Sequence, residues 1–100
     1  MRERARAPWR ADVHVAWLEG LAEIAVATAM DLRAKGLRVT VSDEARSLKS
    51  QLREADRLGA ARVVILGPDE VSKRVATVRE LDSGAQREVP LDALVKELTS

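Results

Sequence analysis

The feature that most constrains this sequence is a short segment past its middle, residues 62–66, which reads RVVIL and is apolar after its first residue. A run of this length, rich in β-branched side chains, is typical of a strand that is covered on both faces. Such a strand lies centrally in its sheet rather than at an edge. The chain is therefore expected to fold around this strand, with helices packed against the sheet.

Hydrophobic periodicity predicts two strands and two helices ahead of it, in the order strand 12–18, helix 21–35, strand 37–41 and helix 47–58. The first helix stops at Gly36, and Ser47 and Gly59 are in positions to cap the second. Strand, helix and strand joined by short connections form right-handed crossover units. The first three strands are therefore expected to run parallel.

Behind the central strand, residues 74–81 and 85–89 flank Asp82-Ser83-Gly84, a turn signal that predicts an antiparallel hairpin. Pro90 then occupies the favoured first position of a last helix, whose inward-facing side chains are Leu91, Leu94, Val95 and Leu98. The predicted fold class is α/β, with a five-stranded mixed sheet and three helices in the order β-α-β-α-β-β-β-α.

The 100 residues are enough for one domain but not for two. Residues 1–11 are arginine-rich and lack a hydrophobic period, so they are interpreted as a flexible basic arm or linker, and residues 12–100 as the domain. No apolar run reaches the length of a membrane span or a signal peptide, and cysteine is absent. These observations predict a cytoplasmic protein without a membrane partner.

Residues suited to catalysis are scarce. His14 is the only histidine and lies inside the first predicted strand, where we expect it to have a structural role. The acidic pairs Asp43-Glu44 and Asp69-Glu70 fit loops or helix starts as well as they fit a metal or glycosidase site. The first strand-to-helix joint, Trp17–Gly20, lacks the glycines of a phosphate-binding loop. We therefore expect no catalytic residue, no metal site and no cofactor.

Basic residues collect on one face of the second predicted helix. Seventeen basic and sixteen acidic residues give a net charge of only +1, so any site for a polyanion must be local. At 100° per residue, a single stripe within about 80° contains Arg46, Lys49, Arg53 and Arg57. A solvated face is an equal alternative for this stripe. For Trp17, a core or cover position is favoured over a binding role.

The position of the stripe favours binding. Ligands of open α/β sheets bind beyond the carboxyl ends of the parallel strands, where Trp17 ends the first strand and Arg46 leads into the second helix. Unpaired RNA bases are recognised by stacking and by contacts to their edges, while lysine and arginine hold the phosphates. The pattern therefore indicates a site for single-stranded RNA at this edge.

The segment ARSLKSQLREADRLGAARVVILGPDEV, residues 45–71, resembles the anticodon-binding domain of histidyl-tRNA synthetases. The similarity continues through VATVRELDSGAQREVPLDALVKEL to Leu98, and residues 12–44 resemble the family more loosely. The resemblance implies an accessory domain that holds the tRNA anticodon stem-loop beside a catalytic synthetase domain, or with a homodimer partner, and is no enzyme by itself. Carried over by position, the RNA-binding residues would be Trp17, Leu18, Glu19, Arg46, Ser47, Lys49, Gln51 and Arg53.

Two departures from the family pattern fall on this edge. Residues 16–20 read AWLEG where the family usually has a Pro-Leu-Gly-Glu type of joint, and Ala45 replaces the glycine expected before Arg-Ser-Leu. An alternative interpretation is therefore a protein-interaction or regulatory domain that kept the fold and lost anticodon reading.

Overall fold

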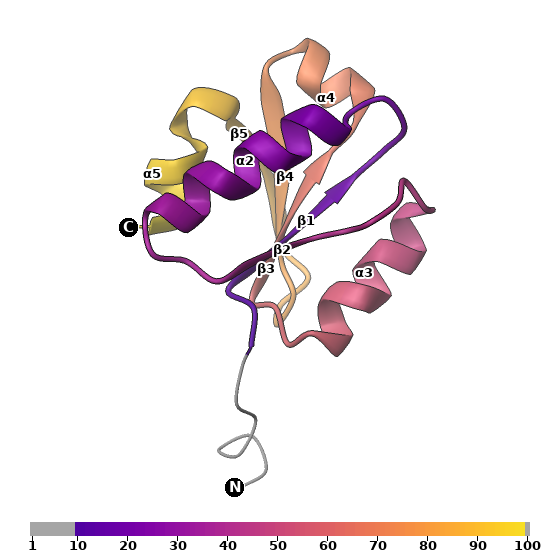
Figure 1. Ribbon diagram of the computed structural model, residues 1–100, viewed down its shortest axis with the longest axis vertical. Helices are drawn as coiled ribbons and strands as arrows, with labels where there is room; N and C mark the ends of the chain where they lie inside the picture. The colour runs from indigo at the N-terminus through magenta and orange to yellow at the C-terminus, as the bar shows by residue number, and fades with distance from the viewer. Residues whose placement is uncertain (1–9, 100) are drawn as a thin grey trace, which may run out of the picture.

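The computed structural model describes residues 10–99 (Figure 1). Most of the predicted basic arm lies outside the described residues. Its last two residues, Arg10 and Ala11, contact the domain: Nη2 of Arg10 donates a hydrogen bond to the carbonyl of Gly59 at 3.2 Å, and the amide of Ala11 donates to the carbonyl of Leu58 at 3.3 Å.

The elements follow the predicted order, with one helix added. They are β1 (Val13–Trp17), α2 (Ala22–Ala34), β2 (Val39–Val41), α3 (Leu48–Arg57), β3 (Arg62–Leu66), α4 (Pro68–Ser72), β4 (Val75–Glu80), β5 (Gln86–Pro90), the 3-10 turn η1 (Leu91–Ala93) and α5 (Leu94–Thr99). The predicted α/β class and the five-stranded mixed sheet are confirmed.

The sheet has the strand order β2-β1-β3-β4-β5. Strands β2, β1 and β3 are parallel, with Val13 opposite both Val39 and Arg62, and β4 and β5 add an antiparallel hairpin. The apolar strand β3 lies at the centre, as its composition predicts. All three parallel strands therefore present their carboxyl ends at one edge of the sheet.

Helices cover both faces of the sheet (Figure 1). On one face, α2 and α5 bury Ala25, Leu32 and Leu94 against a cluster that includes Val64 and Leu66. On the other face, α3 packs Ala55 and its partly buried leucines against a smaller cluster of sheet side chains, among them Ala16, Val63 and Ile65. Alternation along β1 and β3 sends neighbouring side chains into different clusters.

Three boundaries differ from the sequence prediction. Residues 68–72, which the prediction assigned to a break, form the short helix α4, with Pro68 in its first turn and Gly67 before it in an extended conformation. Pro90 ends β5 instead of starting a helix, because an edge strand tolerates the missing N–H. Strand β2 is shorter than predicted: the Asp12 carboxylate accepts the Arg38 amide, and the regular ladder begins only at Val39.

Candidate nucleic-acid interface

Two turns meet at the carboxyl edge of the parallel strands. The first follows β1, from Leu18 to Leu21, and the second follows β2 and leads through residues 42–47 into α3. Because β1 and β2 are parallel neighbours, their following turns lie next to one another. The sequence predicts that the turn after the first strand and the turn before the second helix lie next to each other. The structure has this arrangement.

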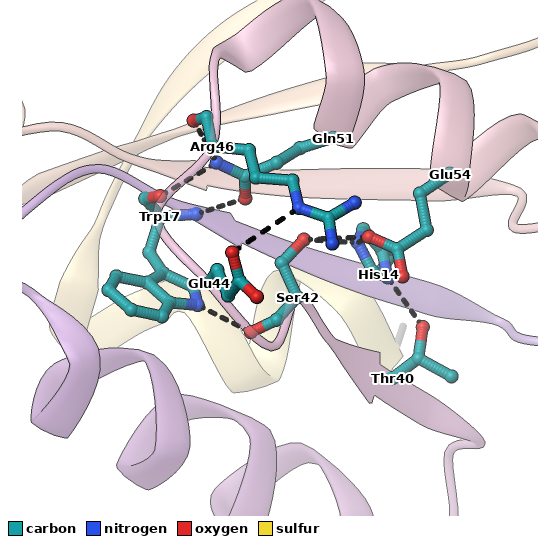
Figure 2. Close-up of polar contacts among 8 residues, drawn as sticks. All are labelled: His14, Trp17, Thr40, Ser42, Glu44, Arg46, Gln51 and Glu54. Carbon is teal, nitrogen blue, oxygen red and sulfur yellow. Dashed lines mark hydrogen bonds and ion pairs between the residues drawn. The ribbon is translucent and has the colours of Figure 1, made fainter.

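The side chain of Gln51 joins the two turns (Figure 2). Its Oε1 accepts a hydrogen bond from the Trp17 amide, and its Nε2 donates to the carbonyls of Trp17 and Arg46, each at 2.8 Å. Gln51 is fully buried. It therefore lies beneath the edge, not on its surface, and all of its contacts in this group are with backbone atoms.

The indole of Trp17 is anchored as well. Its Nε1 donates to the carbonyl of Ser42 at 2.8 Å, and the partly buried ring packs against the core cluster beneath α2. The helix α3 covers the opposite face of the sheet. The structure thus brings the backbone of Trp17 next to the start of α3, while the ring lies on the other face from the cations of α3. The expectation that the ring and these cations share one surface is therefore wrong.

The remaining predicted residues of the edge reach solvent. Ser47 caps α3 by accepting the Ser50 amide at 3.2 Å, which starts the helix at this point. Lys49 and Arg53 are exposed on its outer face. Arg46 is exposed too and forms an ion pair with Glu44, with Nε 3.7 Å from Oε1, so part of its charge is offset.

Two residues complete the edge from the other turn. Leu18 is partly buried and Glu19 is exposed. Glu19 is therefore an exposed hydrogen-bond acceptor on the first turn, and the exposed cations come from the second turn and from α3.

A buried polar network supports α3 from below. Between β1 and β2, Nδ1 of His14 lies 2.6 Å from Oγ1 of Thr40, and Nε2 lies 2.9 Å from Oγ of Ser42. Ser42 donates its hydroxyl hydrogen to Oε1 of Glu54 on α3 at 3.1 Å. Ser42 must then accept from Nε2 of a neutral imidazole, and Thr40 donates to Nδ1.

Burial is the dominant influence on His14. It lowers the pKa of the imidazole below its ordinary value of 6.5, and the nearby Glu54 carboxylate, 3.7 Å from Nε2, opposes this only in part. Both ring nitrogens have partners and no side-chain atom reaches solvent. The residue consequently has the structural role that its place in a strand predicted.

The sequence did not predict the hydrogen bond from Ser42 to Glu54. It placed Gln51 near the RNA site but did not predict that this side chain is buried. A signal for Gln51 exists, since it lies on the same helical face as Leu48, Leu52 and Ala55. No signal distinguishes Glu54 from an ordinary solvated acid. Among residues 10–99 no group of three side chains suited to a metal ion occurs, and no helix is long and apolar enough to cross a membrane.

The fold and this edge define a class of α/β module, a mixed five-stranded sheet whose three parallel strands end beside two adjoining turns. A family model described as "Anticodon binding domain" matches residues 12–100. The chain belongs to this family.

Two curated relatives are histidine–tRNA ligases. The histidine–tRNA ligase of Nitratidesulfovibrio vulgaris (strain DP4) is 40% identical over 99 residues, which are 98% of this chain and 24% of the relative. That of Geobacillus thermodenitrificans is 46% identical over 68 residues, 68% of this chain and 16% of the relative. This chain therefore spans about a quarter or less of the length of these relatives.

Two solved structures share this fold. The crystal structure of histidyl-tRNA synthetase from Nostoc sp. PCC 7120 superposes with a TM-score of 0.83 at 32% identity, covering 92% of this chain and 21% of that one. The RNA binding domain of threonyl-tRNA synthetase from Cryptosporidium parvum has a TM-score of 0.78 at 22% identity, over 90% of this chain and 23% of that one, and shows a likeness of fold alone.

Proposed function

We propose that this domain binds the anticodon stem-loop of a tRNA and serves histidyl-tRNA recognition, with no catalysis of its own. The observation that carries the proposal is the junction of two turns at the carboxyl edge of the sheet, held by three hydrogen bonds of Gln51. The family relationship supports it, because the relatives are histidine–tRNA ligases.

The surface residues divide into two roles. Arg46, Lys49 and Arg53 hold phosphates. Lys49 and Arg53 are exposed on α3, whereas Arg46 lies before the N-cap, so the helical stripe predicted from the sequence does not extend to it. Glu19 and the hydroxyl of Ser47 contact base edges, and Leu18 offers apolar contact to a base. All these groups come from the two connecting segments, residues 18–21 and 42–47, and from the amino-terminal half of α3.

The other two predicted residues are less available to RNA. Trp17 presents only part of its ring, and Gln51 presents no atom to solvent. Direct contacts with RNA are therefore assigned to the six surface residues of the edge: Leu18, Glu19, Arg46, Ser47, Lys49 and Arg53.

The wider setting is also a proposal. The relatives are about four times as long as this chain or longer, so we place the domain beside a catalytic synthetase domain in the cytoplasm. The catalytic domain would charge the tRNA, while this domain selects it. The proposed contacts depend on charge, apolar contact and hydrogen bonds, and none of them requires a metal or a cofactor.

A titration tests the proposal. A labelled anticodon stem-loop of histidine tRNA and a hairpin of equal length with a scrambled loop are each titrated with the protein at several salt concentrations, and fluorescence anisotropy gives the Kd. We expect tighter binding of the histidine stem-loop. Lys49→Ala should weaken it and lower the slope of log K against log salt by about 0.7 to 0.9, the value of one phosphate contact.

Lys35→Ala is the matched control. Lys35 is also exposed, but it follows the end of α2, beside the amino-terminal start of β1 and far from the candidate edge. This substitution should leave both the Kd and the salt slope unchanged. Equal affinity for the two hairpins, or equal effects of the two lysine substitutions, would refute anticodon binding at this edge.

A second candidate function is self-association through α2, the alternative in which the domain kept the fold but lost anticodon reading. On the outer face of α2, Val26 is 50% exposed and Met30 is 60% exposed. Glu23 and Arg33 are exposed near opposite ends of α2, so an antiparallel pair of α2 helices would bring opposite charges together, with the Arg33 guanidinium already bound to the carbonyl of Val39. Sedimentation velocity would then show a dimer that Val26→Glu dissociates, in a protein that ignores tRNA.

A further inference from the structure

The end of β1 lacks a strand on one side. Strand β3 pairs with β1 as far as Trp17, whereas β2 pairs with it only as far as Val15. The last bond on the β2 side runs from the Ser42 amide to the carbonyl of Val15 at 3.1 Å. Beyond this point the chain of β2 turns away toward α3.

The amide and the carbonyl of Trp17 point to that unpaired side. Along β1, Leu18 donates its amide to the carbonyl of Leu66 on β3 at 3.0 Å, so the backbone groups of the preceding residue face the other way. Buried backbone groups without a partner cost about 1 to 3 kcal/mol each. Something must replace the strand at this position.

Gln51 supplies the replacement. Its carboxamide contains one acceptor and two donors, as a peptide group contains an acceptor and a donor, and both backbone groups of Trp17 bind to it. The second donor of the same amide reaches the carbonyl of Arg46, one residue before the N-cap of α3. One side chain thus fixes the end of β1 and the start of α3 to each other (Figure 2).

We propose that Gln51 is a positioning residue for RNA: it sets the spacing between the turn that bears Glu19 and the helix start that bears Arg46 and Lys49, without touching RNA itself. The inference rests on the proposed function, since the spacing matters only if both turns contact one ligand. Binding sites whose groups are held in place before binding lose less entropy when the ligand arrives. Gln51 therefore contributes to affinity through geometry.

The chemistry of the amide restricts which substitutes would serve. Glutamate in its ionised form keeps the acceptor but loses both donors, and it faces two carbonyl oxygens. Methionine has a similar length but leaves the backbone groups of Trp17 without partners. Gln51→Glu and Gln51→Met should both separate the two turns, although the fold around them is determined mainly by the two core clusters.

The test compares RNA affinity with stability. Gln51→Glu, Gln51→Met and the control Val89→Ala are titrated with the histidine anticodon stem-loop at a temperature at which urea unfolding shows each protein to be fully folded. Val89 is buried on the edge strand β5, so its truncation lowers stability away from the site. We expect about a tenfold loss of affinity or more for the Gln51 variants, and less than about twofold for Val89→Ala.

Hydrogen exchange of the Trp17 amide supplies a second readout. In the wild type this amide should exchange as slowly as those of the strand core, and in the Gln51 variants it should exchange much faster. Wild-type affinity in a Gln51 variant with a fast-exchanging Trp17 amide would overturn the positioning role alone. A fast-exchanging Trp17 amide in the wild type would also overturn the positioning role. If the wild type does not bind the stem-loop, both the positioning role and the proposed function are refuted.

Discussion

The buried imidazole of His14 makes the stability of this domain sensitive to mild acid. In the folded state, burial lowers the pKa of His14 below 6.5, the value expected for the unfolded chain. As the pH falls below 6.5, the unfolded state binds a proton that the folded state resists. The free energy of unfolding should therefore fall in this range, and stability should be greatest above it.

The magnitude follows from proton linkage. One proton bound by the unfolded state and not by the folded state changes the free energy of unfolding by up to about 1.4 kcal/mol per pH unit. The free energy of unfolding continues to fall until the pH reaches the lowered pKa of His14 in the folded protein. Since domains of this size are stable by about 5 to 15 kcal/mol, one pH unit removes a measurable share.

Carboxylates contribute at lower pH and can be separated from this effect. Burial raises the pKa of Glu80, but hydrogen bonds from Arg87 and Arg62 outweigh it and hold the pKa below its ordinary value of 4.5. The stability that Glu80 contributes is therefore present above pH 4.5 and is lost only as the pH falls further. The change in the free energy of unfolding between pH 4.5 and pH 6.5 therefore mainly reports the protonation of His14.

Urea unfolding followed by circular dichroism at a series of pH values measures the effect. The wild type should lose stability between pH 6.5 and 5, and His14→Gln, which has no titrating ring but can still bond to Thr40 and Ser42, should show a flat profile there. The variant will be less stable at neutral pH. An equal slope in the two proteins would refute the assignment of the proton to His14.

Two further predictions concern the helix start and the core. Ser47→Ala should cost about 1 kcal/mol in urea unfolding, because the Ser50 amide loses the oxygen that caps α3, whereas Ser50→Ala keeps the cap and should cost less. Leu66→Ala should cost about 2 to 5 kcal/mol, because the side chain is fully buried between the central strand and the helices on that face, and Met30→Ala on the surface of α2 should stay within about 0.5 kcal/mol.

The sequence predicted the sheet well because each strand carries its own local signal. The apolar run of β3 and the turn at Asp82-Ser83-Gly84 are properties of adjacent residues, and the parallel pairing follows from short connections between alternating elements. Helix α4 has five residues, which is too short for a helical period to appear. Its signals, a proline in the first turn followed by acids, are also those of a turn.

The candidate site was predictable in its place but not in its internal contacts. The position of Lys49 beyond the carboxyl ends of parallel strands follows from topology. The anchoring of the Trp17 ring on the face of α2 depends on which way the last residue of β1 points, and the bond to Ser42 depends on how β2 ends. These are tertiary facts that local sequence patterns do not contain.

The most direct test of the account is a map of where RNA touches the protein. Amide chemical shifts recorded by NMR during titration with the histidine anticodon stem-loop should change at residues 17–19 and 46–53, and should stay unchanged at the exposed face of α2 around Met30 and along α5. Shift changes confined to α2 or α5, or spread evenly over the molecule, would contradict the claim that the two turns joined by Gln51 form one RNA-binding edge.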